Sequence, residues 1–95
     1  MGIRGKSDID NISEAITEAL EYLETLATGI LSGLYDEDMA YSRIGNRVVF
    51  FYEKNKRFIY ESQSLAGSDL YVQLTQLARN WQSRERHAGY KKPRV

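Results

Sequence analysis

Residues 9–34, IDNISEAITEALEYLETLATGILSGL, decide the fold of this chain. Their apolar side chains recur every three or four positions, which is the spacing of one face of an amphipathic helix. At about 100° per residue these positions form a single stripe, and the carboxylates fall on nearly the opposite side. The segment is therefore predicted to be a helix with one apolar and one anionic face. The apolar positions are Ile9, Ile12, Ile16, Leu20, Leu23, Ala27, Ile30, Leu31 and Leu34, and the acidic positions are Asp10, Glu14, Glu18, Glu21 and Glu24.

The ends of this helix carry capping residues. Ser7 is a favoured N-cap, and the Asp10 carboxylate is placed to accept a hydrogen bond from the Ser7 amide. Gly33 is a candidate C-cap, because glycine adopts the left-handed conformation at little cost. Gly29 lies inside the apolar pattern, where it indicates a bend or a close helix contact.

A second helix is indicated directly after the first. Asp36 is a natural N-cap, and Glu37 and Asp38 place negative charge in the first turn. Apolar residues then recur at helical spacing from Ala40 to Ile59, which predicts one long helix.

The same region has a competing interpretation as a β-hairpin. Residues 47–52 and 57–61 are rich in Val, Ile, Phe and Tyr and are separated by a polar segment. No Gly or Pro lies between residues 46 and 66, and the polar segment lacks the Asn-Gly or Asp-Gly of a tight hairpin turn. A lone hairpin on a helical chain would also leave two open strand edges. We therefore favour the helix.

A third helix follows a break at Gly67. Ser68 is a candidate N-cap, and apolar residues recur from Leu70 to Trp81. The pattern then gives way to basic residues, and Pro93 cannot continue a helix. The chain is predicted to be a single all-α domain over residues 1–95, a small three-helix bundle with two long helices, a short third helix and a basic tail. The expected ranges are a flexible arm at 1–7, helices at 8–33, 36–63 and 68–86, and the tail at 87–95.

Charge is balanced over the whole chain and unevenly distributed along it. The 95 residues include 13 basic and 13 acidic side chains, so the net charge is zero. From Asp8 to Asp38 there are nine acidic residues and no basic one, whereas from Arg79 to Val95 there are six basic residues and one acidic. Zero net charge argues against a general polyanion binder. Two opposed blocks indicate either an interaction surface or two ends that neutralise each other.

Composition favours the cytoplasm. The chain has no cysteine, and so neither a disulfide nor a thiolate metal site. No apolar run approaches the roughly 20 residues needed to cross a bilayer. The first seven residues lack the apolar centre of a signal peptide. We therefore expect a cytoplasmic protein without a membrane partner.

The order of these features resembles a family of small all-helical domains of unknown function found in bacteria and their phages. The resemblance covers about residues 20–85, implies an all-helical fold and brings no catalytic residues to carry over to this chain. We expect this chain to depart from the larger members as the domain alone, with a basic tail and no membrane segment. By analogy, a short copy is expected to be a phage or mobile-element accessory protein, a class that includes inhibitors of host defence enzymes. The matching segments are Tyr22–Ile30, Gly33–Asp38, Ser68–Tyr71, Leu77 and Trp81.

The acidic face of the first helix is the leading candidate for a binding surface. An exposed helix usually alternates its charges, since like charges four residues apart cost a few tenths of a kcal/mol. Here no cation interrupts the carboxylates, so either basic residues of the second helix lie beside them or a partner with a basic surface supplies the positive charge. An ordinary solvated face is the alternative. We expect a host protein complex to be bound and inhibited through Asp10, Glu14, Glu18, Glu21, Tyr35, Asp36, Glu37 and Asp38.

No arrangement of residues indicates catalysis. His87 is the only histidine and has no acid or orienting group at a recognisable spacing. A di-metal site in a helical bundle needs Glu-x-x-His motifs, which the chain lacks. The glycines at 2 and 5 do not have the spacing of a phosphate-binding loop. We therefore expect no enzyme activity, no cofactor and no metal.

Two other functions stay open. The basic tail is able to lie along a phosphate backbone while its tyrosine stacks on a base, which would give weak and salt-sensitive nucleic-acid binding. A homodimer that pairs long helices is the other, since a chain of this length buries only about 60–65% of its unfolded surface. The residues of the nucleic-acid alternative are Arg84, Arg86, Tyr90, Lys91, Lys92 and Arg94.

Overall fold

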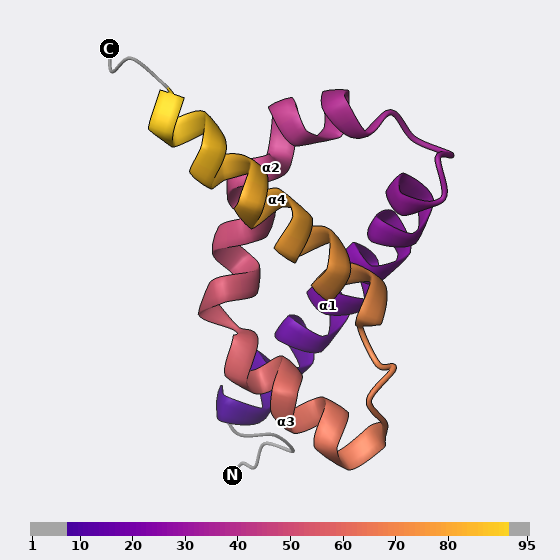
Figure 1. Ribbon diagram of the computed structural model, residues 1–95. Helices are drawn as coiled ribbons and strands as arrows, with labels where there is room; N and C mark the ends of the chain where they lie inside the picture. Colours follow the sequence, from indigo (N-terminus) through magenta and orange to yellow (C-terminus); the bar gives the residue numbers. More distant parts are fainter. Residues whose placement is uncertain (1–7, 92–95) are drawn as a thin grey trace, which may run out of the picture.

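A computed structural model describes the backbone of residues 8–91 and the side chains of residues 10–87. The described chain is entirely helical, as predicted, and contains no strand, so the hairpin interpretation of residues 47–61 is wrong. It has four helices rather than the predicted three, and they enclose one core (Figure 1). They are α1 (Asp8–Leu31), α2 (Glu37–Lys54), α3 (Lys56–Ala66) and α4 (Val72–Lys91).

The helix expected at residues 36–63 is divided in two at Asn55. The Asn55 backbone has φ −115° and ψ 16°, outside the helical region, and its N–H is shared between the carbonyls of Phe51 (3.1 Å) and Tyr52 (3.2 Å). The Asn55 side-chain amide also donates to the Phe51 carbonyl at 2.9 Å. A polar side chain that bonds to the preceding turn competes with the regular helical ladder, and the chain changes direction there. The apolar spacing continues across Asn55, so it carried no sign of the break.

The end of α1 is a Schellman motif centred on Gly33. Gly33 has a left-handed φ of +86°, its N–H donates to the Ile30 carbonyl (3.1 Å), and the Leu34 N–H donates to the Gly29 carbonyl (2.9 Å). These two bonds satisfy carbonyls that the helix end leaves open. The C-cap predicted at Gly33 is thus confirmed. Gly29 was expected to mark a bend or a close helix contact; the neighbour is instead the Tyr35 ring from the turn after α1, which occupies the place that a Cβ atom would take.

The start of α4 lies four residues after the predicted cap Ser68. The residue before the helix, Tyr71, is buried and holds a left-handed φ of 59°, which is uncommon without glycine. Glu24 of α1 caps this end: its carboxylate accepts hydrogen bonds from the N–H groups of Gln73 (3.1 Å) and Leu74 (2.7 Å). The helix then continues to Lys91, so part of the predicted tail, residues 87–91, has a helical backbone; residues 92–95 lie outside the described range.

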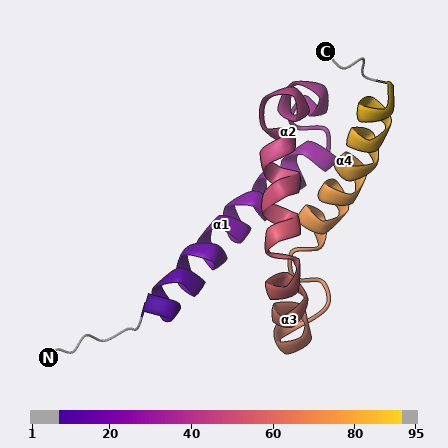
Figure 2. The ribbon, with the colours of Figure 1, turned by 90° about the vertical axis from the view of Figure 1, so that its left-hand side faces the viewer.

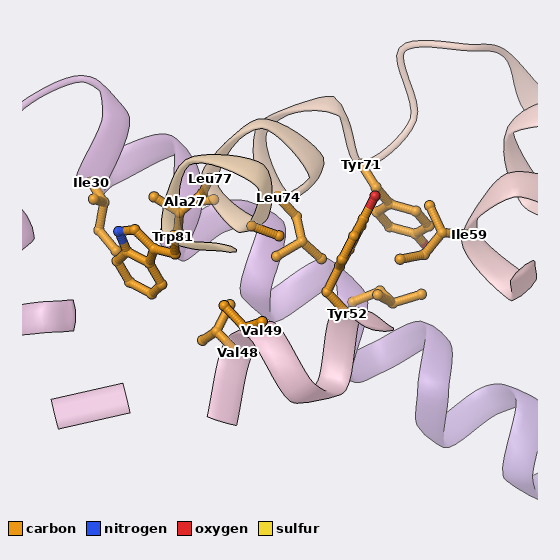
Figure 3. Close-up of a cluster of buried hydrophobic side chains, with 12 residues drawn as sticks. Ala27, Ile30, Val48, Val49, Tyr52, Ile59, Tyr71, Leu74, Leu77 and Trp81 are labelled. Atoms are coloured by element: carbon orange, nitrogen blue, oxygen red, sulfur yellow. The ribbon is translucent and has the colours of Figure 1, made fainter. Parts of the chain in front are cut away.

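The core is built around α4, which packs against both α1 and α2. Helices α1 and α2 make few contacts with each other, so α4 lies across the angle between them (Figure 1). Figure 3 shows this core, which includes Ile30 of α1, Val48 of α2 and Trp81 of α4. At the opposite end of the core, Ile59 packs α3 beside Tyr52 and Tyr71. Burial of each such side chain stabilises the fold by about 1.5–3 kcal/mol. The core residues are Leu20, Ala27, Ile30, Val48, Val49, Tyr52, Ile59, Tyr71, Leu74, Leu77, Ala78 and Trp81.

The overall shape is elongated. The principal extents are 56 × 31 × 22 Å, and the radius of gyration is 15.8 Å. A compact chain of this length has a radius of gyration of about 12 Å. Figure 2 shows the reason: the first half of α1 projects away from the other three helices. Leu20 is the first buried side chain, and none of the described side chains at residues 10–19 is buried.

Candidate protein-interaction surface

Four of the predicted binding residues lie on the exposed side of α1. The helical turn of 3.6 residues brings them to one face, opposite the stripe that leads to the core. Three are on the projecting half of the helix, and the fourth follows immediately after Leu20 (Figure 2). The ion pairs within the described residues include neither Glu18 nor Glu21, so basic residues of α2 do not neutralise these two. The four exposed carboxylates are Asp10, Glu14, Glu18 and Glu21.

Glu24 does not belong to this face, although its sequence position placed it among the same carboxylates. Its side chain is half-buried and turned toward α4, where it accepts hydrogen bonds from two N–H groups of the first turn. Together with burial, the charges of Glu21 and Glu24 raise the pKa of the Tyr71 hydroxyl; burial is the larger cause. Glu24 and the N–H group of Gln73 are 49 residues apart, so the spacing of residues around Glu24 does not indicate this capping role and the sequence analysis missed it.

The predicted acidic residues of the turn after α1 have partners within the chain. Asp36 caps α2 by accepting a hydrogen bond from the Met39 N–H (3.1 Å), as its sequence position predicted. The Glu37 carboxylate accepts from the Trp81 indole N–H at 3.0 Å. Asp38 forms an ion pair with Arg84 at 3.0 Å. Asp36 therefore stabilises the start of α2, and Glu37 and Asp38 connect α2 to α4.

Tyr41 completes this junction between α2 and α4. Its ring meets Trp81 edge-on, with ring centroids 5.4 Å apart and planes at 75°, and the Arg84 guanidinium lies 4.1 Å from its centroid. Burial raises the pKa of the Tyr41 hydroxyl, with a smaller contribution from Glu85. Tyr35, the last of the predicted partner-binding residues, is 48% exposed beside Gly29.

The basic residues of the nucleic-acid alternative are not gathered into one described cluster. Arg84 is committed to Asp38 and to the Tyr41 ring, whereas Arg86 is exposed. The side chains of Tyr90 and Lys91, and all of Lys92 and Arg94, lie outside the described residues.

An apolar groove between α1 and α2 is the feature that sequence reasoning did not find. It consists of two adjoining hollows of about 320 and 410 Å³ that share Leu26. Leu23 and Leu26 line it from α1, and Ile44 and Phe51 line it from α2. All four side chains are only partly buried. The groove exists because α1 and α2 diverge, and divergence of two helices cannot be read from the periodicity of either.

Among the described residues, the remaining candidates for a chemical role are a metal site, His87 and Glu85. No group of three or more His, Asp or Glu side chains in this part of the chain is placed to hold a metal ion. The His87 ring is exposed, and its Nδ1 lies 2.9 Å from the Ser83 carbonyl one turn earlier. Burial, and secondarily the charge of Glu53, raises the pKa of the Glu85 carboxyl. Of the described helices, none has the length and apolar character that a membrane span requires.

These observations define a small all-helical domain with a projecting acidic helix. The chain belongs to a family described as Domain of unknown function (DUF4760), whose family model matches residues 3–81. The resemblance to a family of domains of unknown function is thereby confirmed. Neither the curated proteins nor the solved structures include a significant match to the chain.

Proposed function

We propose that this chain is a non-enzymatic protein–protein interaction domain that docks the acidic face of α1 onto a basic surface of a partner protein. The observation that carries the proposal is the projection of α1, which presents Asp10, Glu14 and Glu18 on a helix half whose described side chains are all at least partly exposed. A single-signed face on a projecting element accelerates encounter with an oppositely charged surface. Asp36, Glu37 and Asp38 have partners within the chain, so Tyr35 is the residue of this turn that we expect to contribute to docking.

The partner that we propose is a host protein complex whose basic site the domain covers, as an accessory protein of a phage or mobile element would do in the host cytoplasm. Enzymes that act on nucleic acid bind phosphates through Lys and Arg, and an acidic helix competes for such a surface. The family resemblance supports this setting by analogy.

A capture experiment from bacterial lysate tests the proposal. Tagged protein is used with and without nuclease, at low and high salt. We expect a stoichiometric protein partner that survives nuclease and is released as salt rises, because exposed charges are screened. Recovery of nucleic acid alone would contradict this proposal and assign binding to the basic end of α4 and the residues after it.

A charge-reversal variant locates the surface. One variant combines Glu14→Lys, Glu18→Lys and Glu21→Lys and so reverses the α1 face. The control combines Glu53→Lys, Glu61→Lys and Asp69→Lys, which make the same change in net charge at exposed positions elsewhere. We expect the first variant to lose the partner and the second to keep it. Equal binding by both, with helical circular dichroism unchanged, would show that the acidic face is not the docking surface.

A further inference from the structure

The apolar stripe of α1 continues past the core onto the projecting half of the helix. Ile12 is 59% exposed, and Ile16 and Ala19 are only partly buried. At about 100° per residue, these three positions lie on the same side of α1 as Leu23, which lines the groove. The chain thus has both an exposed apolar ridge and an open apolar groove, and nothing within the described residues covers either.

From this self-complementarity we infer that the protein forms a homodimer in which the projecting half of α1 of each copy lies in the α1–α2 groove of the other. Under twofold symmetry both contacts form together, because the ridge of each copy lies in the groove of the other. The ridge would bring Ile12 and Ile16 against Leu26 and Phe51 of the second copy.

Charges at the margins of ridge and groove favour a second copy as the occupant. Arg47 lines the groove, Arg43 lies one turn earlier on the same side of α2, and neither belongs to an ion pair among the described residues. On the ridge, Glu18 lies at the edge between the apolar stripe and the acidic face. When the ridge of one copy lies in the groove of the other, Glu18 comes close to Arg43 and Arg47, and these opposite charges attract at the partly desolvated edge of the interface.

The elongated shape supports the same conclusion. A radius of gyration of 15.8 Å, against about 12 Å for a compact chain of this length, reflects the projecting half of α1, none of whose described side chains is buried. Interlocking the two projecting halves covers them with apolar surface. Asp10, Glu14 and Glu21 face away from the groove side of α1, so this inference shares only Glu18 with the acidic docking surface proposed above.

Sedimentation equilibrium between about 5 and 200 µM tests the dimer. We expect the wild-type chain to have twice the mass of one copy, and Ile12→Glu to raise the dissociation constant at least about tenfold, because it places a charge in the buried centre of the interface. Leu65→Glu is the matched control, since Leu65 is 91% exposed on α3, away from ridge and groove. A wild-type monomer over this range, or equal behaviour of the two variants, would overturn the inference.

A charge swap provides a second test that leaves the apolar contacts intact. Arg47→Glu alone should weaken the dimer, and adding Glu18→Lys to it should restore most of the lost affinity. Because both side chains are exposed in one copy, these variants are expected to fold, which far-ultraviolet circular dichroism checks. Failure of Glu18→Lys to restore the Arg47→Glu dimer would refute the proposed arrangement.

Discussion

Glu24 takes the place of an N-cap residue for a helix that begins 48 positions later in the chain. An N-cap side chain normally accepts from the second and third N–H groups of its own helix. Here those groups belong to Gln73 and Leu74, and a carboxylate from α1 reaches both. The residue before the helix, Tyr71, has no such side chain and holds a left-handed backbone, which costs on the order of 1 kcal/mol. The capping bonds and the burial of the Tyr71 ring offset that cost.

Replacing Glu24 by alanine should therefore weaken the fold. Two hydrogen bonds to a charged acceptor are lost, and we expect the free energy of unfolding to fall by about 2 kcal/mol in urea denaturation. Glu24→Gln keeps one acceptor oxygen and should cost less. Glu21→Ala, which removes an exposed carboxylate of the same helix that faces away from the groove, is the control and should change stability little. Equal stability of the Glu24 and Glu21 variants would contradict the capping role.

Glu85 makes stability depend on pH in a defined direction. Its Oε2 atom is buried without a hydrogen-bond partner among the described residues, and burial followed by the charge of Glu53 raises its pKa above 4.5. A raised folded-state pKa favours the fold below pH 4.5, and this contribution is lost as pH rises through the folded-state value.

Glu85→Gln removes that titration. We expect the variant to unfold at a higher temperature than the wild type at pH 7, because it no longer carries a buried charge. The advantage should disappear below about pH 4.5, where the wild-type carboxyl is protonated in both states. Thermal unfolding of the two proteins at pH 7 and pH 4 measures the difference, and a variant that is less stable at pH 7 would contradict the argument.

At the scale of elements, the sequence predicted the helix ends and caps that depend on neighbouring residues. The helix over residues 8–33 is found at Asp8–Leu31, and the caps at Gly33 and Asp36 are confirmed, because each depends on atoms within a few residues. The break at Asn55 was missed, since helical spacing of apolar residues runs through it. The start of α4 was placed four residues early because Ser68 has the chemistry of a cap, while the actual cap comes from another helix.

The Schellman motif at the end of α1 gives a prediction for Gly33. Its φ of +86° is available to glycine and is strained for a residue with a Cβ atom, while a Cβ atom there would meet no neighbour within 4 Å. Gly33→Ala should therefore cost about 1 kcal/mol through backbone conformation alone. Gly33→Asn should cost less, because asparagine tolerates the left-handed region. Urea midpoints of the two variants test this, and an alanine variant as stable as the wild type would contradict it.

At the scale of the molecule, the two candidate surfaces are the acidic face of α1 and the apolar groove between α1 and α2. The sequence predicted the first and not the second. The acidic face is a property of one helix, so the positions of its four exposed carboxylates follow from helical periodicity alone. The roles of Glu37 and Asp38 were not foreseen, because Trp81 and Arg84 reach them only when α2 and α4 pack. The groove likewise results from the angle between α1 and α2, which α4 sets.

The position of α4 in the chain has a consequence for folding during synthesis. Helices α1 and α2 leave the ribosome first, yet they contact each other little, and the core side chains they share become buried against Leu74, Leu77 and Trp81. The core therefore cannot close until about 80 residues have been made and α4 has emerged. Until then the nascent chain exposes the apolar stripes of its first helices, and it is in this interval that chaperones or proteases meet it. The core is thus completed by α4, the last of the four described helices.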